Sequence, residues 1–168
     1  MTLVPDFYCD DIYGITPEYI KEKGIDAVIL DIDNTLVPYE IAEPTEEVRA
    51  WLNALTDNGI KVAFVSNNHA PRVEKFNETL GFPAFPDSGK PFKKACNAAM
   101  AALGSKPENT AIIGDQVFTD VLAGRNAGLK AAFLVKPIKD KTNLFFKTKR
   151  LMEVPVLKKY KRMHGEKG

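Results

Sequence analysis

The sequence predicts a three-layer α/β fold, with a parallel sheet of about five strands covered by helices on both faces. Apolar runs of strand length alternate along the chain with segments whose apolar residues recur at helical spacing. Glycine closes most of the helical segments, as is common at helix C-termini. Such an alternation favours right-handed crossovers between parallel strands that are buried on both faces.

The expected elements follow one another in this order. A short helix begins after Thr16, which is an N-cap followed by Pro17 at the first helical position, and ends at Gly24. Residues 25–31 are a continuous apolar run, typical of a strand buried on both faces. The same patterns predict further helices over 44–58, 71–80, 91–103 and 118–127, and further strands over 60–65, 82–85, 110–113 and 130–135.

Length and composition narrow the class of protein. The chain has 168 residues, of which 45% are hydrophobic and 27% charged, as in a single globular domain. No apolar stretch approaches the roughly 18 residues of a membrane-spanning helix. The first eleven residues carry three Asp and no basic segment, unlike a secretory signal. Cys9 and Cys96 offer neither a disulfide framework nor metal-ligand spacing, so we expect a cytoplasmic protein.

Charge is unevenly distributed between the body and the end of the chain. Residues 136–168 hold 11 Lys and Arg against 3 Asp and Glu; subtracting these from the totals of 23 and 22 leaves 12 against 19 for residues 1–135. A basic tail on an acidic body favours an anionic partner. The alternative is a solvated helical face. We therefore divide the chain into a core over 1–135 and a basic extension over 136–168, packed on the core or appended to it.

Polar and ionisable residues gather where the predicted strands end. These groups are Asp31, Asp33 and Thr35 after the first long strand, Ser66 and Asn67 after the second, Lys90 after the third and Asp115 after the fourth. Ligands of parallel α/β sheets bind outside the carboxyl ends of the strands. We therefore expect these side chains to line one crevice.

The chemistry of these residues indicates phosphoryl transfer. Asp31, Asp33 and Asp115 would repel one another unless a divalent cation lay among them, and oxygen ligands suit Mg²⁺. A carboxylate nucleophile, a second carboxyl group for proton transfer, a metal and a lysine form a phosphoryl-transfer site. Groups that can hold a phosphate there are Lys90, Ser66, Thr35 and backbone amides.

The four segments together resemble the four motifs of the haloacid dehalogenase (HAD) superfamily of phosphohydrolases. In order, the matching positions are 31–35 (DIDNT), Ser66, Lys90 and 114–120 (GDQVFTD). The resemblance covers residues 25 to about 135. It implies the Rossmann-like core of that superfamily, phosphatase activity and Mg²⁺ as cofactor.

The resemblance also implies a role for each matching residue. Asp31 is expected to form an aspartyl-phosphate, and Asp33 to protonate the leaving oxygen and then activate water. Lys90 is expected to offset charge on Asp31 and on the transferred group. The expected metal ligands are Asp31, the backbone carbonyl of Asp33 and Asp115, with Asp120 close to the metal. The expected phosphate-binding residues are Thr35, Ser66, Asn67 and Lys90.

Structural roles are the alternative for several of these residues. Asp33 and Thr35 are also common in turns and caps. Asp120 is acidic and lies early in an expected helix, where the helix dipole favours negative charge without any metal.

A cap domain is expected to be missing. Many HAD phosphatases insert one after the first motif or between the second and third. Only 30 residues separate Thr35 from Ser66, and 23 separate Ser66 from Lys90. The expected helices and strands already occupy both gaps. The site is therefore predicted to be open, which favours large substrates.

The tail has the pattern of basic amphipathic helices. In 142–152 one helical face gathers Leu144, Phe145, Thr148, Leu151 and Met152, and after Pro155 the pattern is repeated by Val156, Leu157, Tyr160 and Met163. The remaining positions are rich in Lys and Arg. Three placements fit: packing on the core, contact with an anionic membrane surface, or contact with nucleic acid.

The whole chain resembles the capless subgroup called subfamily IIIA, in particular the bacterial YqeG-type proteins, which are similar to mitochondrial phosphatidylglycerophosphate phosphatases. The stretches 3–6 (LVPD) and 31–38 carry this resemblance. It implies a Mg²⁺-dependent phosphatase acting on a phosphatidylglycerophosphate-like lipid, in the cytoplasm or peripherally at a membrane. Two alternatives remain: a phosphatase for soluble sugar phosphates, nucleotides or phosphoproteins, and a non-catalytic assembly factor for RNA-containing particles.

Overall fold

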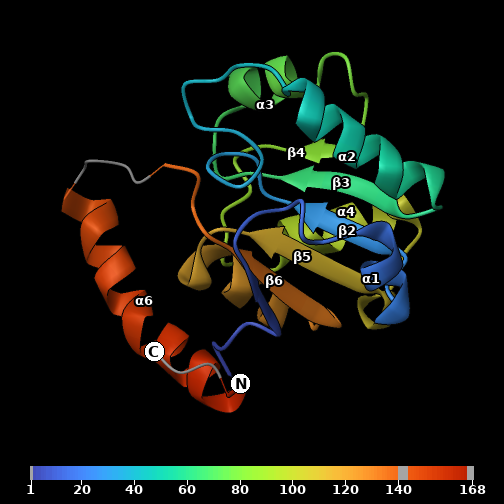
Figure 1. Cartoon of the computed structure of the whole chain (residues 1–168). Coiled ribbons are helices and arrows are strands. Elements are labelled where there is room, and N and C mark those ends of the chain that lie inside the picture. Colours follow the sequence, from blue (N-terminus) through green and yellow to red (C-terminus); the bar gives the residue numbers. More distant parts are fainter. Residues whose placement is uncertain (1, 140–143, 166–168) are drawn as a thin grey trace.

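A parallel sheet forms the middle of the structure (Figure 1). The computed structural model describes residues 2–139 and 144–165, without the side chains of 144–146. Within these residues the sheet has six strands in the order β1-β6-β5-β2-β3-β4, all paired in parallel. The strands are β1 (Phe7–Cys9), β2 (Ala27–Leu30), β3 (Lys61–Val65), β4 (Ala84–Phe85), β5 (Thr110–Gly114) and β6 (Ala131–Val135).

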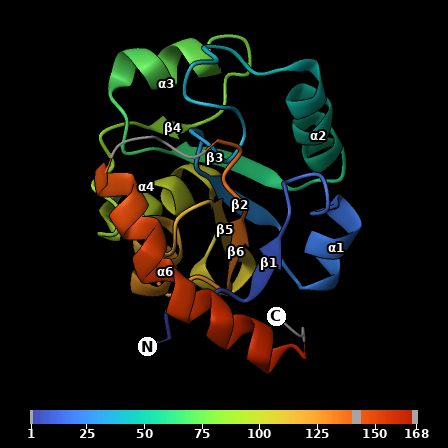
Figure 2. The ribbon, with the colours of Figure 1, turned by 60° about the vertical axis from the view of Figure 1, so that its left-hand side comes forward.

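The predicted three-layer α/β class is confirmed. Helices α1 (Pro17–Glu22), α2 (Glu46–Asp57) and α3 (Ala70–Asn77) cover one face of the sheet. Helix α4 (Lys94–Leu103), the π-helical turn η2 (Val117–Val121) and α5 (Leu122–Asn126) cover the other face. Figure 2 shows α1 and α2 on one side of the sheet and α4 on the other. A short 3-10 turn, η1 (Pro107–Asn109), precedes β5.

Local sequence explains where the first helices begin. Thr16 caps α1 by accepting a hydrogen bond from the backbone N–H of Tyr19 at 3.2 Å. Thr45 caps α2 in the same way, accepting from Val48 at 3.2 Å. Caps of this kind satisfy backbone N–H groups that have no partner inside the helix. The α2 residues facing the sheet are then buried at helical spacing, as predicted.

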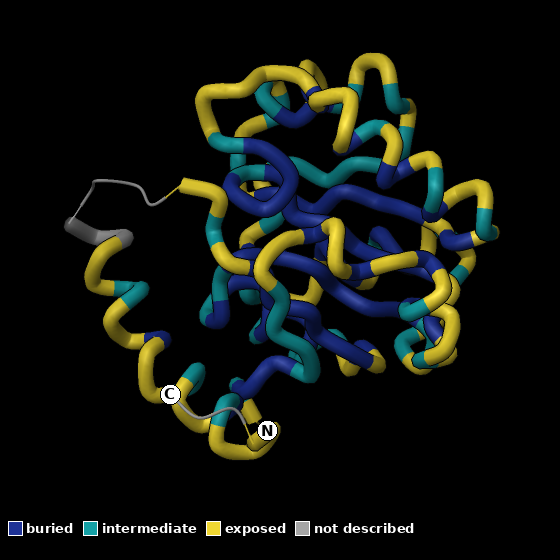
Figure 3. The backbone as a smooth tube through the Cα atoms, in the orientation of Figure 1, coloured by how far each residue is buried: buried dark blue, intermediate teal, exposed yellow. Residues whose placement is uncertain are grey.

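The register of the central strands aligns the ends that carry the polar residues. Leu30, the last residue of β2, lies opposite Phe64 of β3 and Ile113 of β5. The residues that follow each strand therefore meet at one edge of the sheet. The central strands are buried along nearly their whole length (Figure 3), which explains their continuous apolar sequence.

The structure corrects two expectations about the elements. The sheet has six strands rather than five, because β1 joins its edge beside β6, with Phe7 opposite Phe133. Its three half-buried residues are too few to show a strand period in the sequence. The helix expected over 118–127 begins as a π-helical turn, in which Val121 N–H donates to the carbonyl of Gln116 at 3.3 Å.

The predicted absence of a cap domain is confirmed. Residues 36–89 are all described, and they add only loops, α2, β3, α3 and β4 to the core. Neither gap between the motif residues holds a folded insertion. The edge of the sheet that carries Asp31 is therefore not enclosed by a separate domain.

The tail forms one helix, α6 (Leu144–Met163), which continues through Pro155 and bends along its length (Figure 2). The sequence pattern predicts an apolar contact face, yet Leu151, Met152 and Met163 are 71%, 57% and 64% exposed. Other residues of the predicted face do contact the core: Val156 and Leu157 pack against it, and Tyr160 is buried, with its hydroxyl oxygen accepting from the Tyr8 N–H at 3.1 Å. Glu153, which is not part of that face, is buried as well. Thr142 lies outside the described residues, as do the side chains of Leu144 and Phe145.

Candidate active site

The first motif forms a tight turn directly after β2. Asp31 is buried at the end of the strand, and Asn34 adopts a positive φ of 62°. Asn tolerates this left-handed conformation better than most residues. The chain then turns back so that Asp33 pairs with Val37 in an isolated bridge. This turn brings the Thr35 hydroxyl within 3.2 Å of the Asp31 carboxylate.

Lys90 joins two of the acidic residues. Its Nζ donates to Asp31 Oδ1 at 2.8 Å, to Asp120 Oδ1 at 2.6 Å and to the carbonyl of Val65 at 2.9 Å. The side chains of all three charged residues are at most 9% exposed. These pairs are therefore charge-assisted hydrogen bonds shielded from water, which are stronger than their surface equivalents.

Asp115 completes the acidic cluster. Its Oδ1 accepts from the Thr35 hydroxyl at 3.3 Å, so Thr35 bridges Asp115 and Asp31. Oxygen atoms of Asp31, Asp115 and Asp120 all lie within 4.8 Å of one another. The structure thus gathers residues that are up to 89 positions apart in the sequence. The three carboxyl groups are placed where they can surround a cation.

Burial changes the acidity of this cluster. It raises the pKa of Asp31 to about 8; Lys90 opposes the rise, and Asp120 and Asp115 add to it. Burial likewise raises the pKa of Asp115 to about 6, with Asp120 adding to the effect. Burial lowers the pKa of Lys90, but Asp120 and Asp31 more than offset this, so the amine stays charged.

The charges of the cluster fit a divalent cation. One more buried carboxyl group, that of Glu153 on α6, lies beside Arg150, which is ion-paired to Asp115. When all four carboxyl groups are ionised, as metal binding requires, four carboxylates and two cations leave two negative charges, which one divalent ion would neutralise. The donors are all oxygen, as Mg²⁺ prefers. The charged groups counted are Asp31, Asp115, Asp120, Glu153, Lys90 and Arg150.

Gly114 makes room for Asp120. A Cβ atom on Gly114 would lie 2.2 Å from Asp120 Cγ, which is closer than such atoms approach. The Asp120 Oδ2 accepts from the backbone N–H of Gln116 at 3.1 Å, so the π-helical turn folds its own carboxylate back over β5. Asp120 therefore lies within the acidic cluster. The sequence motif predicts only that Asp120 lies close to the metal.

Asp33 is held by two residues outside the four motifs, Arg72 and Asn68. Arg72 of α3 donates to Asp33 Oδ1 from Nη2 at 2.9 Å and from Nε at 3.2 Å. Asn68 donates to Oδ2 at 2.9 Å. The Arg72 side chain also donates to the carbonyl of Ala42 at 3.0 Å, which ties α3 to the loop before α2. No spacing in the sequence marks these contacts, which join residues 35 and 39 positions apart.

Asn67 organises the loop that carries Lys90. Its Oδ1 accepts from the Lys90 N–H at 2.7 Å and from the Ser88 hydroxyl at 2.7 Å, and its Nδ2 donates to the Lys90 carbonyl at 3.1 Å. Ser66 is buried, and its hydroxyl oxygen accepts from the Asn68 N–H at 3.1 Å. Asn67 therefore has a clear positioning role, and its expected phosphate contact stays a prediction.

A cavity of about 340 Å³ opens beside this cluster. It is lined by Asp31, Asp33, Asn34, Tyr39, Ser66, Asn67, Asn68, Gln116, Thr119 and Lys149. Lys149 comes from α6, so the tail contributes a cation to the wall of the cavity. The basic composition of the tail is the sequence feature that could have suggested this, but it does not single out position 149.

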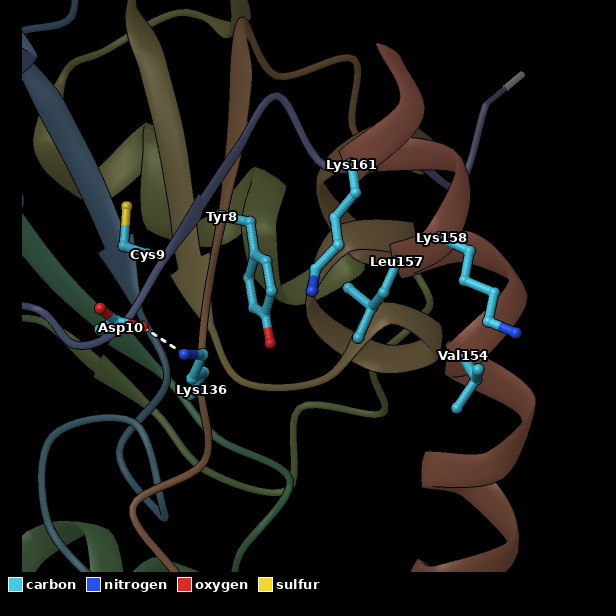
Figure 4. Close-up of a pocket in the computed structure, with 8 residues that line it drawn as sticks. All are labelled: Tyr8, Cys9, Asp10, Lys136, Val154, Leu157, Lys158 and Lys161. Carbon is cyan, nitrogen blue, oxygen red and sulfur yellow. Dashed lines mark ion pairs between the residues drawn. The ribbon is translucent and has the colours of Figure 1, made fainter. Parts of the chain in front are cut away.

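A second cavity of about 540 Å³ lies between α6 and the ends of β1 and β6 (Figure 4). Its lining combines basic and apolar groups, and the side chains of Lys161 and Leu157 point from α6 toward Tyr8. Asp10 forms an ion pair with Lys136 at its edge. A smaller space of about 170 Å³, lined by Tyr8 and Leu157 as well as Asp115 and Arg150, lies between this cavity and the acidic cluster.

Comparison with known proteins identifies the family. The family model described as haloacid dehalogenase-like hydrolase matches residues 38–128, more than half of the chain. The protein named Probable phosphatase YqeG, from Bacillus subtilis (strain 168), is 37% identical over 159 residues, covering 95% of this chain and 92% of that one. Pyrophosphatase PpaX from Halalkalibacterium halodurans is 32% identical over 102 residues, covering 55% of this chain and 47% of that one.

Solved structures agree on the fold. The cobalt-bound deoxy-D-mannose-octulosonate 8-phosphate phosphatase of Haemophilus influenzae superposes with a TM-score of 0.58 at 22% identity, covering 83% of this chain and 91% of that one. An uncharacterised protein from Listeria monocytogenes serotype 4b gives a TM-score of 0.52 at 13% identity, covering 80% of this chain and 99% of that one. The resemblance drawn from the four motifs is thus confirmed, and the chain belongs to the haloacid dehalogenase-like hydrolases.

Proposed function

We propose that this protein is a Mg²⁺-dependent phosphomonoester hydrolase that uses Asp31 as its nucleophile. The observation that carries the proposal is the placement of Asp31, which lines the cavity while Lys90 and Thr35 hold its two carboxylate oxygens. Membership of a hydrolase family and the names of two relatives, Probable phosphatase YqeG and Pyrophosphatase PpaX, support the same reaction class.

The acidic cluster is the proposed metal site. The carboxylates of Asp31 and Asp115 and the backbone carbonyl of Asp33 are the proposed ligands. Asp120, which lies in the same cluster, is a further candidate. A bound Mg²⁺ would supply positive charge that stabilises the ionised form of Asp31 and the transferred phosphoryl group. This role fits the two negative charges that Lys90 and Arg150 leave unbalanced.

The reaction would take place in two steps. An oxygen of Asp31 attacks phosphorus, the bond from phosphorus to the ester oxygen breaks, and Asp33 gives its proton to the departing oxygen. Asp33 then takes a proton from water, which attacks phosphorus, releases inorganic phosphate and restores the Asp31 carboxylate. Arg72 and Asn68 would fix the carboxyl group of Asp33 at the wall of the cavity for both transfers.

Trapping the intermediate tests the nucleophile. Turnover of a phosphomonoester is quenched with acid and treated with borohydride, which reduces an acyl phosphate to an alcohol and leaves a free carboxyl group intact. Peptide mass spectrometry should then find homoserine at position 31 in the wild type. Omission of substrate is the control. Homoserine at another aspartate, or none under turning-over conditions, would refute Asp31 as the nucleophile.

For the substrate we propose an anionic phospholipid monoester of the phosphatidylglycerophosphate type, met at a membrane surface. Residues 36–89 add no cap domain over the active-site edge, so a headgroup could enter the cavity while its chains stay in the bilayer. Helix α6, beside the active-site cavity, exposes Leu151, Met152 and Val154. The second cavity, along the same helix, is lined by Lys158 together with apolar groups. Apolar and basic groups on one helix favour an anionic interface. Within the described parts of the chain, no helix has the length and apolar character to cross a bilayer.

A substrate panel tests this assignment. Phosphate release is compared for phosphatidylglycerophosphate in mixed micelles and for soluble phosphomonoesters, using the wild type and the double variant Leu151→Gln, Met152→Gln. The variant should lose turnover of the micellar lipid and keep turnover of the soluble esters. Equal loss on both, or a wild-type preference for soluble esters, would replace the lipid with a soluble substrate and leave the chemistry of Asp31 in place.

A further inference from the structure

Helix α6 reaches back into the acidic cluster through Arg150. Its Nη1 donates to the backbone carbonyl of Asp115 at 2.5 Å, and its Nη2 donates to Asp115 Oδ2, also at 2.5 Å. One guanidinium therefore holds both the main chain and the side chain of the same residue. Two simultaneous bonds fix the carboxylate in direction as well as in position.

Glu153, one turn further along α6, supports this contact from behind. Its Oε2 accepts from Arg150 Nη1 at 3.1 Å, and its Oε1 accepts from the backbone N–H of Val117 at 2.8 Å. Glu153 is only 3% exposed although it lies on a surface helix. It therefore joins α6 to the first residue of η2, the turn that carries Asp120.

The other oxygen of Asp115 remains directed into the cluster. Asp115 Oδ1 accepts a hydrogen bond from Thr35, which also contacts Asp31, whereas Asp115 Oδ2 accepts from Arg150. The two oxygens of Asp115 therefore have different partners. Arg150 does not neutralise the cluster by itself, because two negative charges remain after it and Lys90 are counted. These contacts fit a residue that orients a metal ligand better than one that takes the place of the metal.

We propose that Arg150 and Glu153 are positioning residues for the metal site, so that the C-terminal helix is part of the active site. Arg150 orients the Asp115 carboxylate, and Glu153 fixes Arg150 and η2 together. The inference rests on the proposed metal site at Asp31 and Asp115. Partners that orient metal ligands typically contribute 10- to 100-fold to metal affinity, so their loss should weaken metal binding by about that factor.

The test is a Mn²⁺ titration of the full chain, with free Mn²⁺ followed by its electron paramagnetic resonance signal. Arg150→Met removes the charge, both hydrogen bonds to Asp115 and the one to Glu153, and keeps an unbranched, largely apolar side chain. Its dissociation constant for Mn²⁺ should rise by about 10- to 100-fold. Arg150→Lys keeps the charge and cannot make the paired contact, so it should bind with intermediate affinity. Arg162→Met, an exposed change on the same helix, is the matched control and should bind as the wild type does.

The outcomes separate the inference from the proposal on which it rests. If the wild type binds no Mn²⁺, the metal site itself is wrong. If the wild type binds Mn²⁺ and Arg150→Met binds it equally or more tightly, the positioning role is overturned, because a guanidinium that merely competes with the metal would give tighter binding when removed. Far-ultraviolet circular dichroism and thermal unfolding without metal verify that each variant is folded. Glu153→Gln should weaken Mn²⁺ binding in the same direction and provides a second, independent test.

Discussion

Substitution of Gly114 by alanine should displace Asp120 from the acidic cluster. The added Cβ would lie 2.2 Å from Asp120 Cγ and 2.4 Å from its Oδ2. For the added Cβ and Asp120 Cγ to reach an ordinary contact distance of about 3.5 Å, the Asp120 side chain must shift by about 1.3 Å. Asp120 is 1% exposed, and its bond to Lys90 is 2.6 Å long. The shift exceeds the margin that remains before a hydrogen bond of this kind is lost, at about 3.2 Å.

The energetic consequence follows from the burial of the pair. Separating one partner from a buried ion pair typically costs about 3 to 5 kcal/mol, because the remaining charge stays in a poorly solvated position. Gly114→Ala should therefore lower the free energy of unfolding by this amount in urea denaturation. It should also weaken Mn²⁺ binding, because Asp120 and its neighbours no longer form one cluster.

Gly14→Ala is the matched control. No heavy atom lies within 4 Å of a Cβ placed on Gly14, and the residue is exposed. Its free energy of unfolding should change by no more than about 0.5 kcal/mol. In the background of Asp120→Gly, Gly114→Ala should cost much less, since this change also removes the Asp120 Cβ, which lies 2.5 Å from the added atom. Equal stability of the two glycine variants, with Mn²⁺ binding intact in both, would refute the account of Gly114.

Three further predictions follow from the site. Burial raises the pKa values of Asp31 and Asp115 to about 8 and about 6, so their contribution to stability is present near pH 4 and is lost as the pH rises toward 8. Because metal binding requires the ionised forms, the Mg²⁺-induced rise in Tm should be larger at pH 8 than at pH 5. A rise in Tm that is independent of pH would count against the metal site. Arg72→Met should lower kcat for alkyl phosphate esters about 100-fold by misplacing Asp33, while leaving Mn²⁺ affinity unchanged. The loss should be smaller for p-nitrophenyl phosphate, whose leaving group needs no proton. An equal loss of kcat for both kinds of ester would contradict the role of Asp33 as an acid. In the absence of metal, Lys90→Met should lower the free energy of unfolding, measured by urea denaturation, by about 3 to 5 kcal/mol, because two buried carboxylates lose their shared cation. An unchanged midpoint of urea denaturation would show that this pairing contributes little.

The sheet and the motif residues are predictable from the sequence because one rule connects them. Parallel strands buried on both faces leave continuous apolar runs, and their carboxyl ends meet at one edge. The ends of β2, β3 and β5 are therefore enough to bring Asp31, Ser66 and Asp115 together. The short edge strand β1 has no such run, and its pairing with β6 depends on contacts across the whole domain.

The contacts of Arg72, Arg150 and Glu153 could not be predicted in this way. Each depends on how a helix lies against a distant loop, which no local period encodes. The hydrophobic pattern of α6 even favours a different face, with Leu151 and Met152 inward. The structure buries Glu153 instead, because Arg150 and the N–H of Val117 satisfy its carboxylate. Tertiary hydrogen bonds thus outweigh the amphipathic pattern before Pro155, whereas Val156, Leu157 and Tyr160 after it lie against the core as the pattern predicts.

The proposed role of Asp31 in Mg²⁺-dependent phosphomonoester hydrolysis is open to direct measurement. Its most direct test is phosphate release with and without Mg²⁺ from a panel of micellar and soluble phosphomonoesters, comparing the wild type with Asp31→Asn and with Asp57→Asn, an exposed change at the end of α2. We expect Mg²⁺-dependent turnover on at least one ester that falls to background in Asp31→Asn and is unchanged in Asp57→Asn. Turnover that survives in folded Asp31→Asn, or a folded wild type inactive on every ester, would contradict it.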